Sequence, residues 1–392
     1  MVSLLILISN LFGGGSERVA SELVNNIPNK YDCQLIIRED TESRYYIGNN
    51  VRKPISLHLS RPTFVPYFIW IIYKLLIDII RYTQNIKRYH ADASMSFLLV
   101  DNFINIISCK LAGTKAIISI RGNPSHDFQS LLNRIIMRVT IFLSRLYAKK
   151  IITNSTGIKK LLIRDFGVKD SIIEVINNPK DIAHIQTLQK VEVTEIFFNT
   201  NKPIIITVGR LTKIKGHDHL IRIFAYLHQE MPCRLVLCGV GELQTQLEQM
   251  AVDLHVCEDV LFIGWCENPY KYMNHSTIFV LPSLTEAQPN SLIEAMICGC
   301  PVVAADCNYG PREILDGGKY GLLSESFFEN IYDTQQPLTP AEIDMANKIH
   351  LVISDSDVRE FWAKQGLVRA SIFDKEAIIK QYLDVIQQVA DI

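Results

Sequence analysis

The chain has 392 residues, enough for two domains of about 150 to 200 residues that each bury a core of their own. Its composition, 48% hydrophobic and 21% charged, excludes a disordered or fibrous protein. The net charge of −1 hides a division, because residues 1–185 hold 24 Lys+Arg against 14 Asp+Glu and the rest hold 16 against 27. The basic half favours an anionic membrane surface or a phosphorylated acceptor, and no RNA-binding or zinc-finger motif supports nucleic acid.

Short apolar runs alternate with helical patterns along the chain. The runs are 4–9, 33–38, 93–99, 115–121 and 149–154 in the first half and 203–209, 234–239, 260–264, 277–283 and 301–306 in the second. Continuous apolar strands separated by helices indicate parallel sheets covered on both faces. The predicted fold class is therefore α/β, with two Rossmann-like domains.

A polar break separates the two halves. The Asn-Asn-Pro sequence at 177–179 interrupts the alternation, and we place the domain boundary around residues 185–200. The first domain is expected over 1–185 and the second over 195–370.

Two helices are predicted towards the C-terminus. Thr339, Pro340 and Glu342 form the pattern of a capping box at a helix start. The segment 374–392 has apolar residues at helical spacing and predicts an amphipathic helix that needs a partner surface.

No segment predicts a transmembrane helix. The N-terminal run has no basic flank and is expected to be a strand rather than a signal peptide. Pro66, Lys74 and Asp78 interrupt the apolar stretch 64–80, so the roughly 20 uninterrupted residues of a span are missing. Nine cysteines without a CxxC framework indicate reduced thiols in the cytoplasm.

A helix predicted over 131–150 has one basic edge beside an apolar face. At 100° per residue, its basic stripe holds Arg134, Arg138, Arg145 and Lys149. The pattern suits a helix at an anionic membrane surface, where the aromatic segment 64–81 would add an interfacial contact. The alternative is a core helix with a solvated edge.

Glycines follow the first predicted strand. The Gly-Gly-Gly-Ser sequence at 13–16 precedes a helix, where backbone amides can approach a phosphate, although a plain tight turn is the alternative. Arg18 stands where a dinucleotide fingerprint has its third glycine. NAD binding is therefore disfavoured, even though Asp40 lies where a ribose-binding acid would.

Two cations follow the first strand of the second half. Arg210 and Lys215 would stand at the strand edge where ligands bind in open α/β sheets, and they would neutralise a diphosphate. The alternative is a solvated basic loop.

Two carboxylates lie between the run 277–283 and the helix after it. Glu286 in the loop and Glu294 in the expected first turn can both bind the hydroxyl groups of a polyol. A phosphate would suit the first amides of this helix, those of Asn290, Ser291 and Leu292. For Glu294 the alternative is a structural capping box with Ser291.

Together these motifs resemble the retaining glycosyltransferases of family GT4, with the GT-B fold. The resemblance covers essentially the whole chain, through the segments 13–18 (GGGSER), 119–124 (SIRGNP), 166–168 (FGV), 176–179 (INNP), 208–216 (VGRL with Lys215 and Gly216), 239–242 (GVGE), 262–269 (FIGWCENP), Glu286 with Glu294, and 310–315 (GPREIL). It implies two Rossmann-like domains facing each other across a cleft, with a C-terminal helix that returns to the first domain. The SIRGNP and GPREIL segments are most similar to the subgroup that transfers hexoses or N-acetylhexosamines from UDP-sugars onto lipid-linked glycans, in bacterial polysaccharide and lipopolysaccharide assembly.

The resemblance implies roles by position. Arg210 and Lys215 would bind the diphosphate, Glu294 the ribose, and Glu286 the donor sugar. The expected catalytic residues are Glu286, Arg210, Lys215 and Arg121. The expected donor-binding residues are Gly14, Gly15, Arg210, Lys215, Gly239, Phe262, Trp265, Glu286, Gln288, Asn290, Ser291, Leu292 and Glu294, with the base near Phe262 and Trp265. Acceptor or membrane contact is expected of Arg134, Arg138 and Arg145.

Some positions depart from the family pattern. Ala287 and Gln288 replace the usual Gly-Phe after Glu286, which alters the pocket wall that faces the sugar. Arg121 stands where many relatives have a histidine, and nearby His126 is expected to be a surface or structural residue. Because no DxD motif ends a strand, neither a metal nor a cofactor is expected.

The predicted function is transfer of a hexose or N-acetylhexosamine from a nucleotide-diphosphate sugar to a lipid-linked saccharide, at the cytoplasmic face of the membrane. Two alternatives stay open. One is another enzyme on the same fold, such as a nucleotide-sugar epimerase or a glycogen phosphorylase-like enzyme. The other is a non-catalytic module that docks glycan-assembly partners on the membrane.

Overall fold

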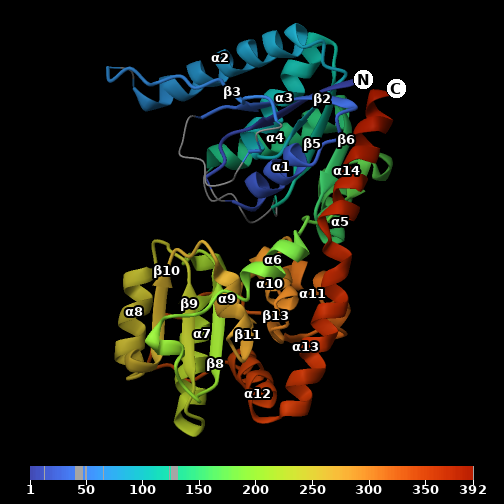
Figure 1. Ribbon diagram of the computed structural model, residues 1–392. Helices are drawn as coiled ribbons and strands as arrows, with labels where there is room; N and C mark the ends of the chain where they lie inside the picture. Colours follow the sequence, from blue (N-terminus) through green and yellow to red (C-terminus); the bar gives the residue numbers. More distant parts are fainter. Residues whose placement is uncertain are drawn as a thin grey trace. The chain divides into compact units, whose positions relative to one another are not determined.

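The computed structural model describes residues 1–12, 14–39, 47–48, 51–64, 66–122, 124 and 131–391. The chain forms two compact units (Figure 1): unit 1 is Met1–Pro179 with Lys375–Ile392, and unit 2 is Lys180–Asp374. The division at Pro179 precedes the boundary expected at 185–200. The reason is that helix α6 (Ile182–Leu188) packs against helix α10 (Asn290–Ile297) of unit 2.

The described part of unit 1 has a seven-stranded parallel sheet in the order β3-β2-β1-β4-β5-β6-β7. The strands are β1 (Val2–Ile8), β2 (Tyr31–Ile37), β3 (Ile55–Ser56), β4 (Ala93–Ser96), β5 (Lys115–Ile120), β6 (Ala148–Thr153) and β7 (Ile173–Val175). The five strands predicted in this half are confirmed. Strands β3 and β7 were not predicted, because two or three residues carry no readable periodicity.

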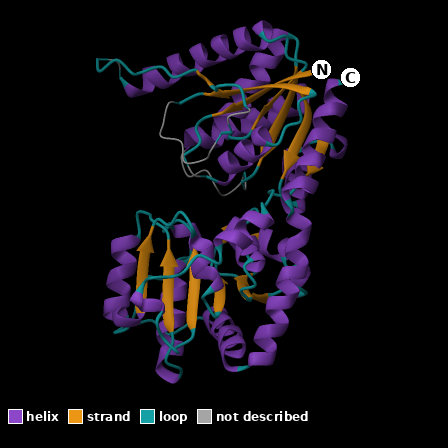
Figure 2. Ribbon diagram, in the orientation of Figure 1, coloured by secondary structure: helices purple, strands orange, loops and turns teal. Residues whose placement is uncertain are grey.

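Helices cover both faces of this sheet (Figure 2). They are α1 (Gly15–Asn25), α2 (Tyr67–Arg88), α3 (Leu99–Ala112), α4 (Leu131–Tyr147), α5 (Thr156–Phe166) and α14 (Lys375–Ala390). Alternate residues of β1 separate the two layers, since Leu4 and Ile6 pack with α1 and α14 whereas Leu5 and Leu7 pack with α2 and α3. The helix predicted at the C-terminus is α14, and the core of unit 1 is its partner surface.

The described part of unit 2 has a six-stranded parallel sheet in the order β10-β9-β8-β11-β13-β15, beside the small pair β12-β14. The strands are β8 (Ile204–Val208), β9 (Arg234–Cys238), β10 (Val260–Gly264), β11 (Ile278–Leu281), β12 (Thr285–Glu286), β13 (Val302–Ala305), β14 (Asn308–Tyr309) and β15 (Leu322–Ser324). All five strands predicted in this half are confirmed.

The helices of unit 2 also form two layers. They are α6 and α10 with α7 (His217–Glu230), α8 (Gln244–Asp253), α9 (Pro269–Asn274), α11 (Gly310–Ile314), α12 (Pro340–Ser354) and α13 (Ser356–Ala370). Ile205 and Val280 pack with α7, α8 and α12, whereas Ile206 and Phe279 pack with α9 and α10. The strand ends are thereby held at one edge of a sheet that is buried on both faces.

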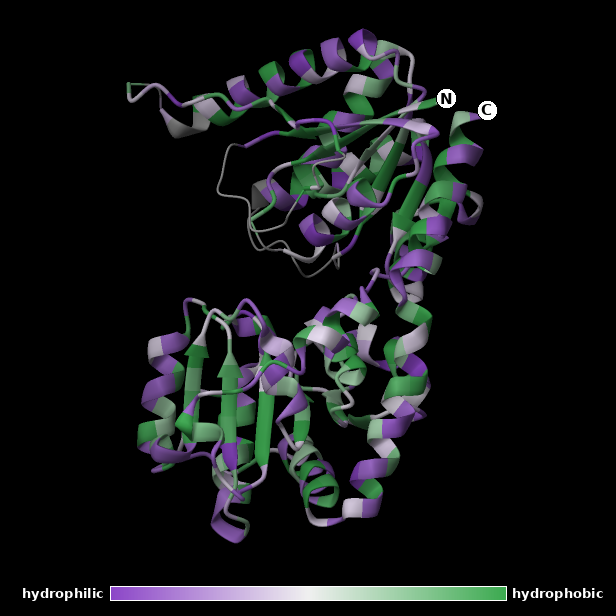
Figure 3. Cartoon of the chain, in the orientation of Figure 1, coloured by the Kyte–Doolittle hydropathy of each residue, from purple (hydrophilic) through white to green (hydrophobic). Residues whose placement is uncertain are grey.

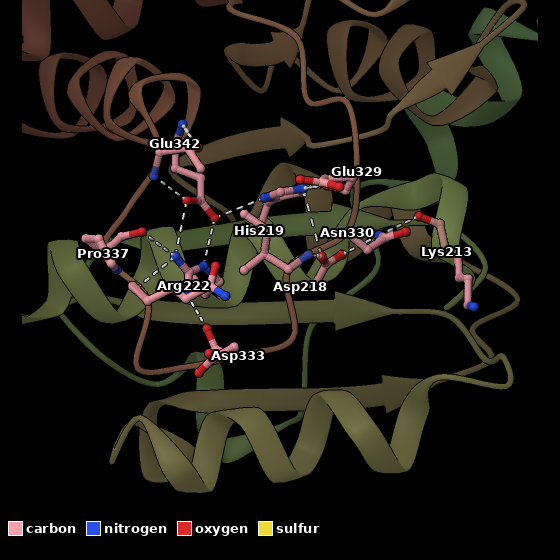
Figure 4. A network of polar contacts seen from close by, with 12 residues as sticks. Lys213, Asp218, His219, Arg222, Glu329, Asn330, Asp333, Pro337 and Glu342 are labelled. Carbon is pink, nitrogen blue, oxygen red and sulfur yellow. Dashed lines mark hydrogen bonds and ion pairs between the residues drawn. The ribbon is translucent and has the colours of Figure 1, made fainter.

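A buried polar network fastens the start of α12 (Figure 4). The predicted capping box forms, because Thr339 N donates to Glu342 Oε2 at 2.7 Å and Glu342 N donates to Thr339 Oγ1 at 3.2 Å. The carboxylate also accepts from Arg222 Nε at 2.9 Å and lies 3.0 Å from His219 Nδ1. Burial alone would raise the pKa of Glu342, but the hydrogen bonds from His219, Arg222 and the Thr339 backbone outweigh it and hold the pKa at about 2.

Candidate functional site

Loops meet at the carboxyl edge of the sheet in unit 2, after β8, β9 and β11. Leu284 N donates to Ile214 O at 2.9 Å, which joins the loops after β11 and β8. Gly216 has a φ of +62°, and a Cβ there would lie 2.1 Å from Pro282 O. A Cβ on Gly239 would lie 1.9 Å from a carbonyl oxygen of the β8 loop. Glycine at both positions is therefore what allows the loops to pack this closely.

Lys215 and Glu286 form an ion pair where two of these loops meet. Lys215 ends the 3-10 turn η3 (Lys213–Lys215), and its Nζ donates to Oε1 of Glu286 in β12. The same oxygen accepts from Ser283 Oγ at 3.0 Å. The two side chains are 20% and 11% exposed, so the pair is sheltered yet partly open to solvent. The structure thus brings together the cation expected to bind a diphosphate and the carboxylate expected to bind a sugar.

Asn330 fastens the turn that carries Lys215, and sequence analysis did not single it out. Its Nδ2 donates to Lys213 O and to Asp218 Oδ1, both at 2.9 Å. The other oxygen of Asp218 accepts from a backbone N–H at 2.7 Å, so η3 is held to α7 (Figure 4). His217 lies beside this turn. Burial lowers the pKa of its side chain to about 3, with a smaller contribution from Lys215, so its ring is neutral at neutral pH.

Glu294 forms a second ion pair, with Lys180. Lys180 Nζ donates to Glu294 Oε1 at 2.6 Å, and the side chains are 0% and 7% exposed. Helix α10 begins at Asn290 after Pro289, with no side-chain cap, so the capping box considered between Ser291 and Glu294 is wrong. Glu294 is the fifth residue of α10 and lies in its second turn, not in the first as expected.

Sequence analysis also missed Lys180. It follows the INNP segment, outside any periodic pattern, and a lysine in such a place is usually exposed. Its partner lies 114 positions further along the chain. Only the fold therefore identifies the pair.

The N-terminal end of α10 faces the same edge of the sheet. Its first amides are those of Asn290, Ser291 and Leu292. This end of a helix carries partial positive charge and favours an anion. Gln288, just before the helix, is 8% exposed, and a Cβ on Gly310 would lie 2.6 Å from Ala287 O. The loop between Glu286 and α10 is therefore held by close backbone packing.

The other expected donor residues of unit 2 follow neighbouring strands. Arg210 and Gly239 come just after β8 and β9, and Arg210 is exposed. Phe262 lies inside β10 and packs partly against the core, whereas Trp265, just beyond β10, is 50% exposed. Their contact with a ligand stays a prediction.

Arg121, Gly14 and Gly15 belong to unit 1. Arg121, just after β5, donates to Tyr382 Oη at 2.7 Å and to Asn178 Oδ1. It therefore ties β5 to α14, a structural role that the sequence did not reveal, and its catalytic role stays a prediction.

The glycines expected to bind the donor lie at the start of α1. Gly14 is the N-cap residue of α1 and Gly15 is its first residue. Outside the described residues lie Gly13, Asp40 and His126.

Helices α2 and α4 turn apolar side chains outward; Figure 3 shows the hydropathy along them. The exposed apolar residues are Ile69, Ile72, Tyr73, Leu76 and Ile80 on α2 and Ile135, Val139, Phe142 and Leu146 on α4. Asp78 on α2 and Thr140 and Ser144 on α4 are buried instead. Both helices also bury apolar residues, such as Tyr82 on α2 and Ile141 on α4, so they carry apolar side chains on their outward faces as well as on their inward ones.

The predicted basic stripe lies on the same helix α4. Arg134, Arg138 and Arg145 are exposed, next to the apolar residues of that face. Lys149 is a correction, because α4 ends at Tyr147 and Lys149 lies in β6. Ile135, Val139 and Leu146 are exposed beside this stripe, whereas Met137 and Ile141 of the same helix are buried, so the alternative of a core helix with a solvated edge stays open.

Within the described ranges, no helix combines the length and apolarity needed to cross a bilayer. Nor do three or more His, Cys, Asp or Glu side chains gather there as metal ligands would. All nine cysteines are free thiols.

Two family models match the chain. The model described as Glycosyltransferase Family 4 matches residues 13–184, and the model described as Glycosyl transferases group 1 matches residues 189–332. An uncharacterized glycosyltransferase of Methanocaldococcus jannaschii is 32% identical over 314 residues, which cover 75% of this chain and 77% of the relative. The N-acetylgalactosamine-N,N'-diacetylbacillosaminyl-diphospho-undecaprenol 4-alpha-N-acetylgalactosaminyltransferase of Campylobacter jejuni is 29% identical over 393 residues, 98% of this chain and 99% of the relative.

Solved structures share the fold. Anabaena HepE in complex with UDP-glucose matches 99% of this chain and 100% of its own, with a TM-score of 0.79 and 20% identity. Sucrose-phosphate synthase from Thermosynechococcus elongatus matches 99% of both chains, with a TM-score of 0.77 and 16% identity. At this identity the likeness concerns the GT-B fold, and it confirms the predicted fold class.

Proposed function

The chain belongs to the family 4 glycosyltransferases, and on that premise we propose that it transfers a hexose or N-acetylhexosamine from a UDP-sugar to a lipid-linked saccharide, with retention of configuration, in cell-surface polysaccharide assembly. The observation that carries the proposal is the pair of carboxylates, Glu286 and Glu294, each bound to a lysine at the carboxyl edge of unit 2. Carboxylates accept from sugar hydroxyls, and the cations and helix end beside them suit a diphosphate.

The chain's own residues divide the donor between them. Glu294 accepts from the ribose hydroxyls, and Glu286 accepts from the hydroxyls of the sugar. Arg210, Lys215 and the amides at the start of α10 bind the diphosphate. When the bond from the anomeric carbon to the diphosphate breaks, both electrons stay on the diphosphate, and these cations stabilise the added charge. The acceptor hydroxyl oxygen bonds to the anomeric carbon, and its proton passes to the departing diphosphate.

No metal ion is assigned a role in this proposal. The sequence lacks a DxD motif at a strand end, so neutralisation of the diphosphate falls to Arg210, Lys215 and the helix end. Charge-assisted hydrogen bonds contribute about 1.5 to 3 kcal/mol each, enough for two of them to offset much of the developing charge.

The acceptor is proposed to be lipid-linked and the enzyme to work at the inner face of the membrane. The Campylobacter relative is named for a diphospho-undecaprenol saccharide. In this chain the outward apolar residues of α2 and α4, with the exposed Arg134, Arg138 and Arg145, form a surface that suits anionic lipid. Apolar side chains would enter the interface while the arginines bind headgroups.

A panel of UDP- and GDP-sugars, tested for protection against thermal unfolding, examines the donor. A sugar nucleotide at 100 times its dissociation constant stabilises the folded state by about 2.7 kcal/mol. We expect protection by a UDP-sugar, and turnover only when a polyprenyl-diphosphate saccharide is added. An isomerised sugar nucleotide formed without acceptor would identify an epimerase instead, whereas protection without turnover on any acceptor would favour the non-catalytic module.

A further inference from the structure

Lys180 is a lysine with no solvent-exposed side-chain surface, next to the carboxylate to which the proposed function assigns the ribose. Its side chain is 0% exposed, and its Nζ lies 2.6 Å from Oε1 of Glu294, which is 7% exposed. Lysines are almost never buried to this extent unless they are paired. The Glu294 carboxylate therefore supplies the kind of charged partner that a buried ammonium needs.

The backbone of Lys180 is held on both sides. Its N–H donates to Phe373 O at 2.8 Å, and Lys180 forms an isolated parallel bridge with Asp374. Its carbonyl accepts from Ile182 N at 3.0 Å, and Asp181 caps α6, which packs on the helix that carries Glu294. A flexible side chain thus starts from a fixed point and reaches a fixed helix, so the position of its ammonium is well defined.

Because the pair is buried, the ammonium favours the ionised form of the carboxylate. A carboxyl group removed from water favours its neutral form, unless an opposite charge lies within about 4 to 6 Å. An ionised carboxylate accepts hydrogen bonds on both oxygens, whereas a protonated one gives up part of that capacity to its own O–H. Two ribose hydroxyls that both donate are therefore bound best by the ionised form.

We propose that Lys180 is a positioning residue of the donor site, whose ammonium holds the Glu294 carboxylate ionised and oriented for the ribose hydroxyls of the nucleotide. This rests on the proposed function, which assigns the ribose to Glu294. Lys180 itself acts through Glu294 and does not contact the nucleotide.

The test is calorimetric titration of the full chain with UDP from pH 5.5 to 8.5. Lys180→Met should bind UDP at least about tenfold more weakly than wild type at pH 6, and the ratio to wild type should narrow as the pH rises and Glu294 ionises. Glu294→Gln should be weakened to a similar degree, with a ratio that does not change with pH. Burial raises the pKa of the nearby Cys298 thiol, which therefore keeps its proton over this range.

A double variant keeps the test decisive if Lys180→Met does not fold. Lys180→Met with Glu294→Gln removes both charges, and it should bind UDP as Glu294→Gln alone does, because Lys180 has then no carboxylate to act on. Much weaker binding by the double variant would overturn the proposal, since Lys180 would act on the ligand by another route.

Arg222→Met is the matched control. Arg222 and Glu342 also form a buried ion pair in unit 2, with side chains 1% and 0% exposed, away from the α10 pair. This variant should lose stability and keep its UDP affinity. Equal loss of affinity in Arg222→Met and Lys180→Met would show only general destabilisation and overturn the proposal.

The variants also separate this proposal from the proposed function. If Lys180→Met binds UDP normally while Glu294→Gln binds it more weakly, the positioning role is wrong but the donor site stands. If Glu294→Gln binds UDP normally, the assignment of the ribose to Glu294 itself fails.

Discussion

The two units differ in how they place the charged and apolar side chains on which the proposed function depends. In unit 2, carboxylates lie inside, each with a cation: Glu294 with Lys180, Glu286 with Lys215, and Glu342 with Arg222. In unit 1, helices α2 and α4 turn apolar and basic residues outward. Unit 1 buries charges too, around Arg38 and Asp101, and unit 2 also exposes some basic and apolar residues, among them Arg210 and Trp265.

This contrast teaches where other molecules are expected. A buried, paired charge costs desolvation, and an exposed apolar face leaves hydrophobic surface in water. Both arrangements become favourable when a ligand of matching chemistry is present. A small, polar, anionic donor suits the first, and an extended lipid surface suits the second.

The largest expected effect is on kcat, when the cations assigned to the diphosphate in unit 2 are replaced. Lys215→Ala and Arg210→Ala should each lower kcat by about 10²- to 10³-fold, because each removes a cation from the departing diphosphate. Lys213→Ala, on the same turn, is the control and should stay near wild type. Near-normal rates in both variants, measured with saturating donor, would remove the diphosphate assignment.

The next effect concerns the outward surface of unit 1. Neutralising Arg134, Arg138 and Arg145 together should weaken binding to anionic vesicles by about a hundredfold, since each basic residue near the surface contributes about 1 kcal/mol. Sedimentation with vesicles measures it, and binding should fall with added salt. As a control of equal charge change, three exposed lysines of unit 2 are replaced, Lys190, Lys319 and Lys364. If both triple variants sediment like wild type, the stripe is an ordinary solvated edge.

A smaller effect separates a ligand role of Glu294 from a purely structural one. Glu294→Gln should bind nucleotide about tenfold more weakly, which corresponds to about 1.4 kcal/mol. Its melting temperature should fall as well, because the buried ammonium of Lys180 loses its charged partner. Lower stability with unchanged affinity in calorimetry would make Glu294 a structural residue only.

A still smaller effect follows from the pKa of Glu342. Its folded-state pKa of about 2 lies below the usual 4.5, so the stabilisation is complete above pH 4.5 and is lost as the pH falls towards 2. Between pH 4.5 and 3.5, protonation of this group lowers the free energy of unfolding by about 1 kcal/mol. Urea unfolding measures the free energy of unfolding over that range, and this free energy should fall less steeply with falling pH in Glu342→Gln than in wild type. If it falls equally in both, other carboxylates control the pH dependence of stability.

The smallest expected effect is none at all. Because arginine, lysine and helix amides are assigned to the diphosphate, added EDTA should leave the initial rate unchanged. Loss of activity on chelation, restored by a divalent cation, would contradict the metal-independent proposal.

Much of the fold was predictable from local patterns. The ten apolar runs became strands because a strand buried on both faces needs consecutive apolar residues. The capping box at Thr339 was also predictable, since its partners are three residues apart. Strands β3, β7, β12, β14 and β15 were not, because their pairing comes from neighbours distant in the chain. The end of α4 was misplaced for a similar reason, as Lys149 lies in β6, at a shift in the register with β5, rather than continuing the helix.

The sequence by itself determined the two-unit α/β plan, because periodicity is a local property of the chain. Its resemblance to a family made Glu286, Glu294 and Lys215 candidate residues of a donor site. Only the tertiary structure decided which charges meet. Lys180 and Glu294 lie 114 positions apart, and Lys215 and Glu286 lie 71 apart. Burial and pairing depend on distances in space, which no spacing along the chain records, so the ion pair of Lys180 with Glu294 was found only in the folded protein.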